Sequence, residues 1–352
     1  MAYTTINKST DYFNTVLYTG NGSTNAITGV GFQPDWLWVK CRSDANGGQI
    51  FDALRTTNSI SPNATDAEAN RASDGFTSLD SDGFTMNGSG SGGNTNVSSR
   101  TYVAWNWLAA NSTASNSDGS ITSTVSANTT AGFSIVSYTG NATSGATIGH
   151  GLGAVPKMII TKNRDQSSGS QDWCVYHVGV GANKGIFLNL TNTPDTNAKY
   201  FNNTTPTSSV FTVGDNLGTN GSGDAMIAYC FAEKKGYSKF GSYTGNGGGT
   251  DGTFVYTGFK PAWIMVKRTD SSNNWIMFDN KRNTSNVLDK YLYANLSDAE
   301  ATGDFVDFTS NGFKWRRSGT ANAVNGSGGT YIYMAFAKAP LVGSNNVPCT
   351  AR

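Results

Sequence analysis

Apolar residues in this chain come in short runs separated by Gly, Ser, Thr and Asn. One run occurs three times, at 31–40, 151–162 and 258–267, and each copy has a glycine, an apolar residue, a proline and then a mostly apolar stretch closed by lysine. Proline has no amide hydrogen to give to a strand ladder, so it fits the start of a strand rather than its middle. The run predicts a buried strand, and because its apolar residues do not alternate with polar ones, we expect both faces to be covered.

Two further markers accompany each copy, the tetrapeptide Tyr-Thr-Gly-Asn before it and an aromatic strand after it. They lie at 18–21, 138–141 and 243–246, and at 102–107, 226–231 and 331–336. The tyrosine stands 22 to 24 residues before the lysine, and the lysine 67 to 69 residues before the last aromatic. Such constant separations indicate an internal repeat. A unit of roughly 90 to 95 residues is too long for a solenoid and suits a small β-sandwich.

The sequence therefore predicts an all-β chain of three tandem antiparallel β-sandwich repeats with short helical decorations. We expect repeat 1 at 1–109, a Ser/Thr/Asn-rich linker at 110–132, repeat 2 at 133–235, repeat 3 at 236–340 and a tail at 341–352. The linker, with one strand at 120–125, would leave repeat 1 the more independent, while the short second junction predicts that repeats 2 and 3 pack closely. Segments 65–69 and 297–301 have Ser or Thr with Glu three residues later, a capping-box pattern that predicts one or two helical turns.

Composition and charge exclude several classes of function. The formal net charge is +1, only 14% of residues are charged and no Lys/Arg cluster occurs, so we expect no nucleic-acid partner. No apolar run reaches the roughly 20 residues that span a bilayer, and the N-terminus lacks a signal-peptide core, so we expect no membrane insertion and synthesis in a cytoplasm. The cysteines lack metal spacing, so we expect free thiols, no metal and no cofactor. They are Cys41, Cys174, Cys230 and Cys349.

Candidate catalytic groups are few. His150 and His177 occur only in the middle copy, and Cys174, three residues before His177, would point to the opposite face of a strand. No serine has the context of a nucleophile. Asp80 and Asp82 resemble a fragment of a calcium loop without its later ligands, which favours a turn. No pair of acids recurs in all three copies, so we expect no catalytic residue, although one active copy stays open.

Possible ligand or partner contacts lie at the end of the central strand and among the aromatics. The arginines and the acids that follow them are Arg42 with Asp44, Arg164 with Asp165, and Arg268 with Asp270. An ion pair at a strand end is one interpretation, and a ligand or subunit contact is the other. Trp275 and Trp315 are candidate platforms for stacking on sugars, and the alternative is that they, like the tryptophans of the central strands, pack in the core.

The combined pattern resembles a repeat family found in tailed phages of marine bacteria. The residues that carry the resemblance are Tyr-Thr-Gly-Asn, Gly-Phe-x-Pro-x-Trp-x-x-x-Lys, Asp-Gly-Phe and Tyr-x-Ala-Trp-Asn-Trp, together with 229–246 and 329–337, and it extends over about 12–340. It implies SPRY-like or concanavalin A-like β-sandwiches in virion structural proteins, often of tail-fibre type. It supplies no catalytic motif.

Three hypotheses follow. The first is a non-enzymatic structural protein on the surface of a tailed-phage virion, in a tail appendage or as a capsid decoration, whose partners are other virion proteins and further copies of itself. The second is a carbohydrate-binding adhesin for a host-surface glycan, which requires exposed aromatics above a polar groove. The third is a glycan-degrading enzyme, which requires convergent acids in a cleft. We expect an oligomer, because something must cover the second face of the central strand. The alternative is that the neighbouring repeat, or the short helical segments near Asp66 and Asp298, cover this face within the chain, which predicts a stable monomer.

Overall fold

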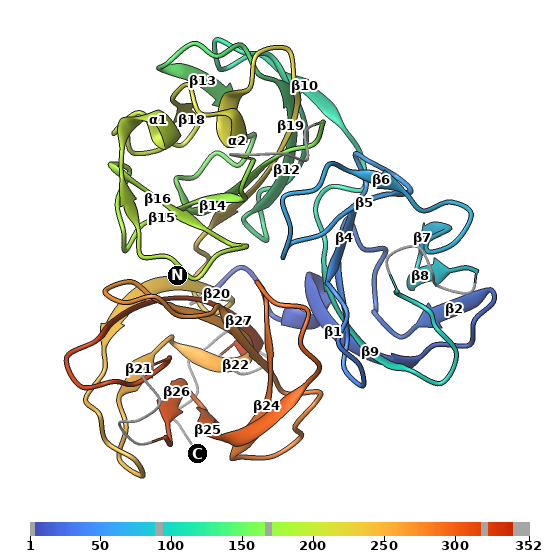
Figure 1. Ribbon diagram of the computed structural model, residues 1–352, viewed down its shortest axis with the longest axis vertical. Coiled ribbons are helices and arrows are strands. Elements are labelled where there is room, and N and C mark those ends of the chain that lie inside the picture. The colour runs from blue at the N-terminus through green and yellow to red at the C-terminus, as the bar shows by residue number, and fades with distance from the viewer. Residues whose placement is uncertain (1–3, 89–93, 166–170, 318–322, 341–352) are drawn as a thin grey trace.

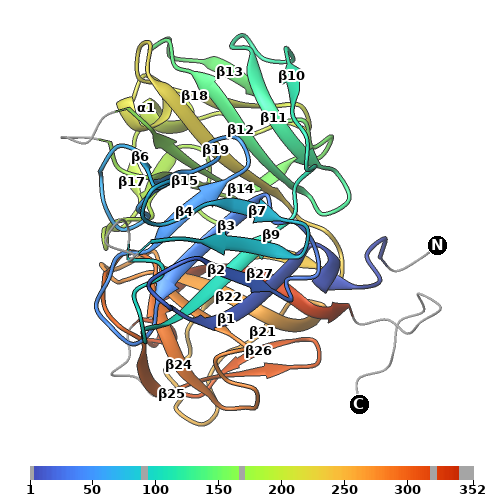
Figure 2. The same cartoon turned by 90° about the vertical axis from the view of Figure 1, so that its right-hand side faces the viewer.

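The computed structural model describes residues 4–88, 94–165, 171–317 and 323–340. It is almost entirely β, and every pair of strands it describes is antiparallel apart from one isolated bridge. Three lobes, one for each sequence repeat, surround a common centre (Figure 1). Figure 2 views the first lobe face on, with the second above it and the third below. None of the helices in the described part of the chain is long and apolar enough to cross a membrane.

The first lobe begins after a short 3-10 turn, η1 (Ser9–Asp11). Its strands are β1 (Phe13–Thr19), β2 (Asn25–Thr28), β3 (Trp36–Cys41), β4 (Gln49–Asp52), β5 (Asn58–Ile60), β6 (Ala69–Asn70), β7 (Ser78–Asp80), β8 (Gly83–Met86) and β9 (Thr101–Trp107). The main sheet has the order β1-β9-β3-β4-β5-β6, and β2-β8-β7 form a second, smaller sheet.

The second lobe repeats this arrangement with additions. Its elements are β10 (Ala114–Asn116), β11 (Ser123–Asn128), β12 (Phe133–Thr139), β13 (Ala146–Gly149), β14 (Pro156–Asn163), β15 (Cys174–His177), β16 (Lys184–Phe187), β17 (Asp195–Thr196), α1 (Ala198–Phe201), β18 (Val210–Val213), α2 (Leu217–Asn220) and β19 (Ala225–Ala232). The main sheet has the order β10-β11-β12-β19-β14-β15-β16-β17, beside the pair β13-β18.

The third lobe closes its strands into one nearly barrel-like sheet. They are β20 (Ser238–Thr244), β21 (Phe254–Tyr256), β22 (Phe259–Arg268), β23 (Ile276–Asp279), β24 (Leu288–Tyr293), β25 (Ala301–Thr309), β26 (Gly312–Trp315) and β27 (Thr330–Pro340). Their order is β20-β27-β22-β23-β24-β25-β26-β21. The five-strand order β1-β9-β3-β4-β5 of the first lobe therefore recurs in both of the others.

The proline-led strand is central in every lobe, as the sequence predicts. It lies between the aromatic strand and the next strand along the chain, and Trp38, Ile160 and Met265 are all fully buried. Pro34 precedes β3 and Pro156 is the first residue of β14. Pro261 lies inside β22, where the register with β27 shifts on both sides of it, so a bulge accommodates the missing amide hydrogen.

Both faces of the central strand are covered within the chain. Successive side chains of a strand point to opposite faces. Trp36 and Trp38 enter a core cluster to which all three lobes contribute, while Leu37 and Val39 enter a cluster private to the first lobe. The same alternation divides β14 and β22 between the shared core and their own lobes. The second face of the central strand is therefore covered by the neighbouring repeats of the same chain, and no second molecule is needed to cover it.

The shared core corrects the expectation that repeat 1 is the more independent. Trp107 of the first lobe packs edge-on against Trp263 of the third at 5.6 Å, and Trp36 lies 4.9 Å from the Tyr229 ring of the second. The first lobe thus contributes to the common core as the others do. A large aromatic core of this kind is the dominant source of stability for a chain with so few charges.

Two local expectations are also corrected. Segment 110–132, expected to be a linker with one strand at 120–125, supplies two strands to the sheet of the second lobe: β11, which overlaps the expected strand, and β10. Segments 65–69 and 297–301 are not helical, and the short α-helices that the structure describes lie in the second lobe instead. Glu68 and Glu300, taken as capping residues, pair with arginines of neighbouring lobes.

Candidate functional site

The lobes meet at three seams that are related in a cyclic order. At each seam the lysine that closes a central strand crosses to a backbone carbonyl of the next lobe. Lys40 donates to Leu296, Lys162 to Thr65 and Lys267 to Thr191. Burial lowers the pKa of all three lysines to about 8. Contacts that recur head to tail around a closed ring define a pseudo-threefold arrangement.

Ionic networks fill two of the three seams. Between the first and third lobes, Arg42 makes two hydrogen bonds of 2.9 Å to the carboxylate of Glu300. Between the second and first lobes, Arg164 binds Glu68 in the same way, at 2.9 and 2.8 Å. In both cases the glutamate amide donates to the carbonyl of the arginine at 2.9 Å. Two parallel charge-assisted bonds and a backbone bond fix each contact.

A fully buried Asp–Arg pair supports each of these contacts. Asp52 binds Arg55 behind Glu68, and Asp279 binds Arg282 behind Glu300. Each aspartate also accepts a hydrogen bond across the seam. The hydroxyl of Tyr229 donates to Asp52 at 2.7 Å, and the indole nitrogen of Trp105 donates to Asp279 at 3.1 Å. Each of the two seams therefore contains the same series of ion pairs, in which an aspartate binds an arginine, that arginine lies beside a glutamate, and the glutamate binds the arginine of the facing lobe.

The third seam, between the second and third lobes, lacks this series. The matching positions are identified by Asn63, Asn189 and Asn295. Each accepts the backbone N–H of the residue immediately before a strand, which is β4, β15 and β23 in turn. Five residues later the other lobes have Glu68 and Glu300, but the second lobe has Pro194. Proline offers neither a carboxylate nor an amide hydrogen.

The aspartate and arginine that accompany the glutamate in the other two seams are also replaced at this seam. His177 occupies the position of Asp52 and Asp279, and Val180 occupies that of Arg55 and Arg282. The Nε2 of His177 lies 3.1 Å from the carbonyl of Tyr333 while its Nδ1 accepts the amide of Gly179, so the neutral ring donates through Nε2. Burial lowers the pKa of His177 to about 4.

Arg268, without a glutamate opposite, turns to its own lobe. It binds Asp270 through bonds of 2.8 and 2.9 Å, and this pairing lowers the pKa of the Asp270 carboxyl to about 2. Its carbonyl accepts from Lys267 at 2.9 Å, in place of the amide bond of the other seams. Arg268 and Asp270 therefore neutralise each other at the edge of this seam.

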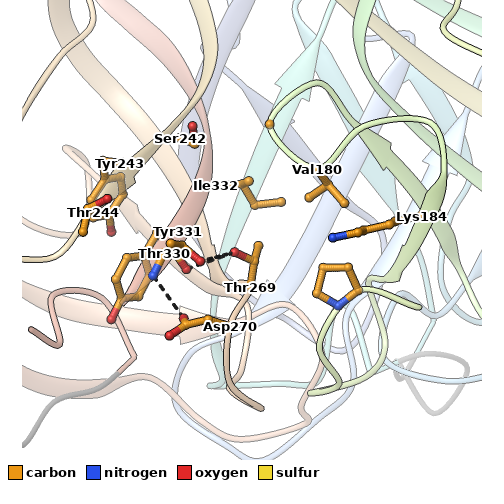
Figure 3. A pocket seen from close by; sticks show the side chains of 12 residues that line it. Val180, Lys184, Ser242, Tyr243, Thr244, Thr269, Asp270, Thr330, Tyr331 and Ile332 are labelled. Atoms are coloured by element: carbon orange, nitrogen blue, oxygen red, sulfur yellow. Dashed lines mark hydrogen bonds between the residues drawn. The ribbon is translucent and has the colours of Figure 1, made fainter. Parts of the chain in front are cut away.

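A pocket of about 600 Å³ lies where the network is missing (Figure 3). The second lobe lines it with Gly179, Val180, Lys184 and Pro194, and the third with Ser242, Tyr243, Thr244, Thr269, Asp270, Thr330, Tyr331 and Ile332. The hydroxyls of Thr269 and Thr330 lie 2.8 Å apart, and the amide of Thr330 donates to Asp270 at 3.0 Å. A pocket of this size falls within the range of about 300–1,000 Å³ that small-molecule sites occupy.

The predicted contact residues fall into three environments. Arg42 and Arg164 join lobes within the chain, and Arg268 lies beside the pocket, paired with the acid that follows it. Trp275 is buried and donates to the carbonyl of Phe187 across the same seam, and Trp315 is buried in the core of the third lobe. Neither tryptophan is a sugar platform, because the core covers both rings.

The remaining candidates have structural partners. All eight tryptophans are fully buried. Cys41, Cys174 and Cys230 are buried free thiols, as predicted, and Cys349 lies outside the described residues. Asp82 accepts the amides of Gly29 and Gly31, so its segment is a turn. His150 contacts the carbonyl of Thr207. Within the described residues, no group of three or more His, Cys, Asp or Glu is placed to hold a metal.

Sequence reasoning missed the pocket, although a signal was present. The histidine, valine and proline that distinguish the third seam all stand in the middle copy, and from the sequence His177 is considered as a catalytic candidate but not as a seam residue. Aligning the three copies at Asn63, Asn189 and Asn295 reveals the two glutamates and the proline. What the alignment does not show is that these positions face a neighbouring lobe.

One family model matches residues 8–340, and its description is Domain of unknown function (DUF7483). The chain belongs to this family. The match extends across all three lobes, so the family unit is the complete ring and not the single repeat. No curated protein and no solved structure matches the chain.

Proposed function

We propose that this protein is a non-enzymatic structural component of the surface of a tailed-phage virion, in a tail appendage or as a capsid decoration. The observation that supports the proposal is the shared core, which combines three lobes into one body with only its outer faces and loops free. Such a body suits a role in which other virion proteins, or further copies of the chain, contact a preformed surface. The resemblance of its repeats to phage proteins supplies the setting.

The proposal includes a finer description of the fold. Each lobe is a jelly-roll sandwich of the SPRY-like or concanavalin A-like kind, and the recurring five-strand order with a short second sheet in the first two lobes supports this. A crystal structure superposed on solved members of those folds tests it. Lobes that superpose only as isolated sheets would contradict the assignment.

Purified virions test the structural role. Mass spectrometry of particles banded by density, and gold-labelled antibodies against the purified chain, should both detect the protein on intact particles. The chain should appear in infected host cytoplasm before particles assemble. Its presence in the lysate but not on purified particles would contradict the proposal.

A second candidate function, recognition of a host-surface glycan, is favoured by the seam pocket. The buried tryptophans remove the aromatic platforms that this hypothesis first required, but the pocket offers hydroxyls, a carboxylate and an ammonium to a polar ligand. Fluorescently labelled protein should bind host cells and lose binding after periodate oxidation of the cell surface. Binding that periodate leaves unchanged would contradict glycan recognition.

A further inference from the structure

Two charged side chains, Lys184 and Asp270, line the pocket between the second and third lobes. Arg268 and Asp270 form a closed pair at its edge. Lys184, on the first residue of β16, lines the opposite wall, and the described residues include no carboxylate within ion-pair distance of its ammonium. Figure 3 shows the Lys184 side chain extending from the second lobe into the space before Thr269 and Asp270. A half-buried lysine that has no carboxylate partner in the described part of the chain favours an anionic ligand group.

The wall formed by the third lobe is suited to hydroxyl groups. Thr244, Thr269 and Thr330 present hydroxyls, which can donate and accept, and Asp270 presents carboxylate oxygens that only accept. Thr269 and Thr330 already bond to each other, and Asp270 accepts from Arg268 and Thr330, so a ligand would use the lone pairs and hydroxyl hydrogen that remain. The hydroxyls of Tyr243 and Tyr331 are already used inside the lobe, where they contact Val324 and Gly326. Hydrogen-bonding capacity is therefore concentrated on the threonine side of the pocket.

Apolar groups complete the lining. Val180 and Pro194 take the positions where the other seams have arginine and glutamate, so they replace a charged network with carbon surface. Ile332 lies between the two walls in Figure 3. The pocket thus has an ammonium on one side, hydroxyls and a carboxylate on the other, and apolar contacts between them.

We propose that this pocket binds a sugar that carries a carboxylate, of the uronic-acid class. Its carboxylate would pair with Lys184, its ring hydroxyls would bond to Thr269, Thr330 and Asp270, and its C–H face would lie against Val180 and Pro194. This inference rests on the second proposed function and specifies its ligand. Among the described residues, the other two seams hold a glutamate where this seam has Pro194, and that glutamate binds the arginine of the facing lobe in each case.

Titration calorimetry of the full chain with methyl glucuronide and methyl glucoside tests the proposal. The glucuronide should bind, and the neutral glucoside should bind about tenfold more weakly or worse, a loss of about 1.4 kcal/mol. Lys184→Ala should reduce glucuronide affinity by a similar factor. Lys290→Ala is the matched control, because Lys290 lies at the corresponding position of β24, away from the pocket, and should leave binding unchanged.

Pro194→Glu provides a second test that does not rely on removing a charge. The new carboxylate would stand where Glu68 and Glu300 stand in the other seams, opposite Arg268, and would repel the ligand carboxylate. Glucuronide binding should fall about tenfold or more, with the melting temperature kept or raised. Equal binding of both sugars, no binding of either, or unchanged glucuronide binding by Lys184→Ala or Pro194→Glu would overturn the proposal. Glucuronide binding without attachment to host cells would count against the adhesin function and leave the site intact.

Discussion

At the scale of the residue, the tryptophans connect the lobes as well as filling them. Trp105 lies in the shared core, donates its indole N–H to Asp279 of the third lobe, and has the guanidinium of Arg282 5.7 Å from its ring centre. One side chain therefore contributes packing, a hydrogen bond and a cation–π contact across a seam. Trp275 links two lobes through a similar bond to Phe187.

Trp105→Ala should lower the free energy of unfolding by about 3–5 kcal/mol. The change creates a cavity in the shared core and leaves Asp279 without one of its donors. Urea denaturation followed by circular dichroism measures the loss. Phe254→Ala is a suitable control, since Phe254 is 45% exposed and surface changes usually stay within about 0.5 kcal/mol. A Trp105 variant that unfolds like the parent chain would contradict the described burial.

His177 should make the chain less stable in mild acid. Its folded pKa is about 4 and its ordinary value is 6.5, so between these pH values the unfolded state binds more protons. Stability then falls as pH drops from 6.5 to 4, by roughly 3 kcal/mol from this residue. His177→Gln should remove that part of the slope, and His150→Gln, for which burial also lowers the pKa, serves as comparison. Parallel profiles of the His177 variant and the parent chain would count against the assignment.

At the scale of the element, the strands were predictable and their cover was not. Short apolar runs bounded by turn residues located the central and aromatic strands of all three lobes. Apolar and polar residues do not alternate in β3, which showed that both faces of this strand are covered. A neighbouring repeat and a second molecule would both require apolar residues at these positions, so the sequence could not tell which of them provides the cover. Segment 65–69 was misread because the Glu68 carboxylate reaches Arg164 in another lobe, a contact that no local pattern records.

Glu300→Ala should weaken the seam between the first and third lobes. Glu300 accepts from Arg42 and lies 3.4 Å from Arg282, so its loss leaves the Arg42 guanidinium without its acid in a mostly buried site and leaves Arg282 with Asp279 alone. We expect a loss of about 1–3 kcal/mol in unfolding free energy. Glu233→Ala is the control, because Glu233 pairs with Lys239 in a contact that is more exposed than the one between Glu300 and Arg42. It should cost under about 1 kcal/mol in unfolding free energy. Equal effects of the two changes would show that the seam pair is no more than a surface ion pair.

At the scale of the whole molecule, the three repeats pack around one hydrophobic core. The inner strands of each lobe present large apolar side chains to the shared core, and seam bonds surround that core. The constant spacing of the sequence markers predicted the number of lobes and the size of each. It did not give their cyclic packing, because spacing along the chain contains no information about which faces meet in space.

An excised lobe should therefore fail to fold by itself. A fragment of residues 111–236 would expose Phe133, Tyr229 and Phe231, which are fully or almost fully buried in the intact chain. An exposed patch of this kind leads to aggregation or a loosely packed state, which dye binding and a broad melting transition would reveal. The complementary fragments 1–110 and 111–352, co-expressed, should assemble into a stable complex, because the cut leaves every core contact available. The intact chain should unfold in a single cooperative transition. A monomeric fragment that melts sharply would show that the lobes are independent domains and that the shared core is only a contact between them.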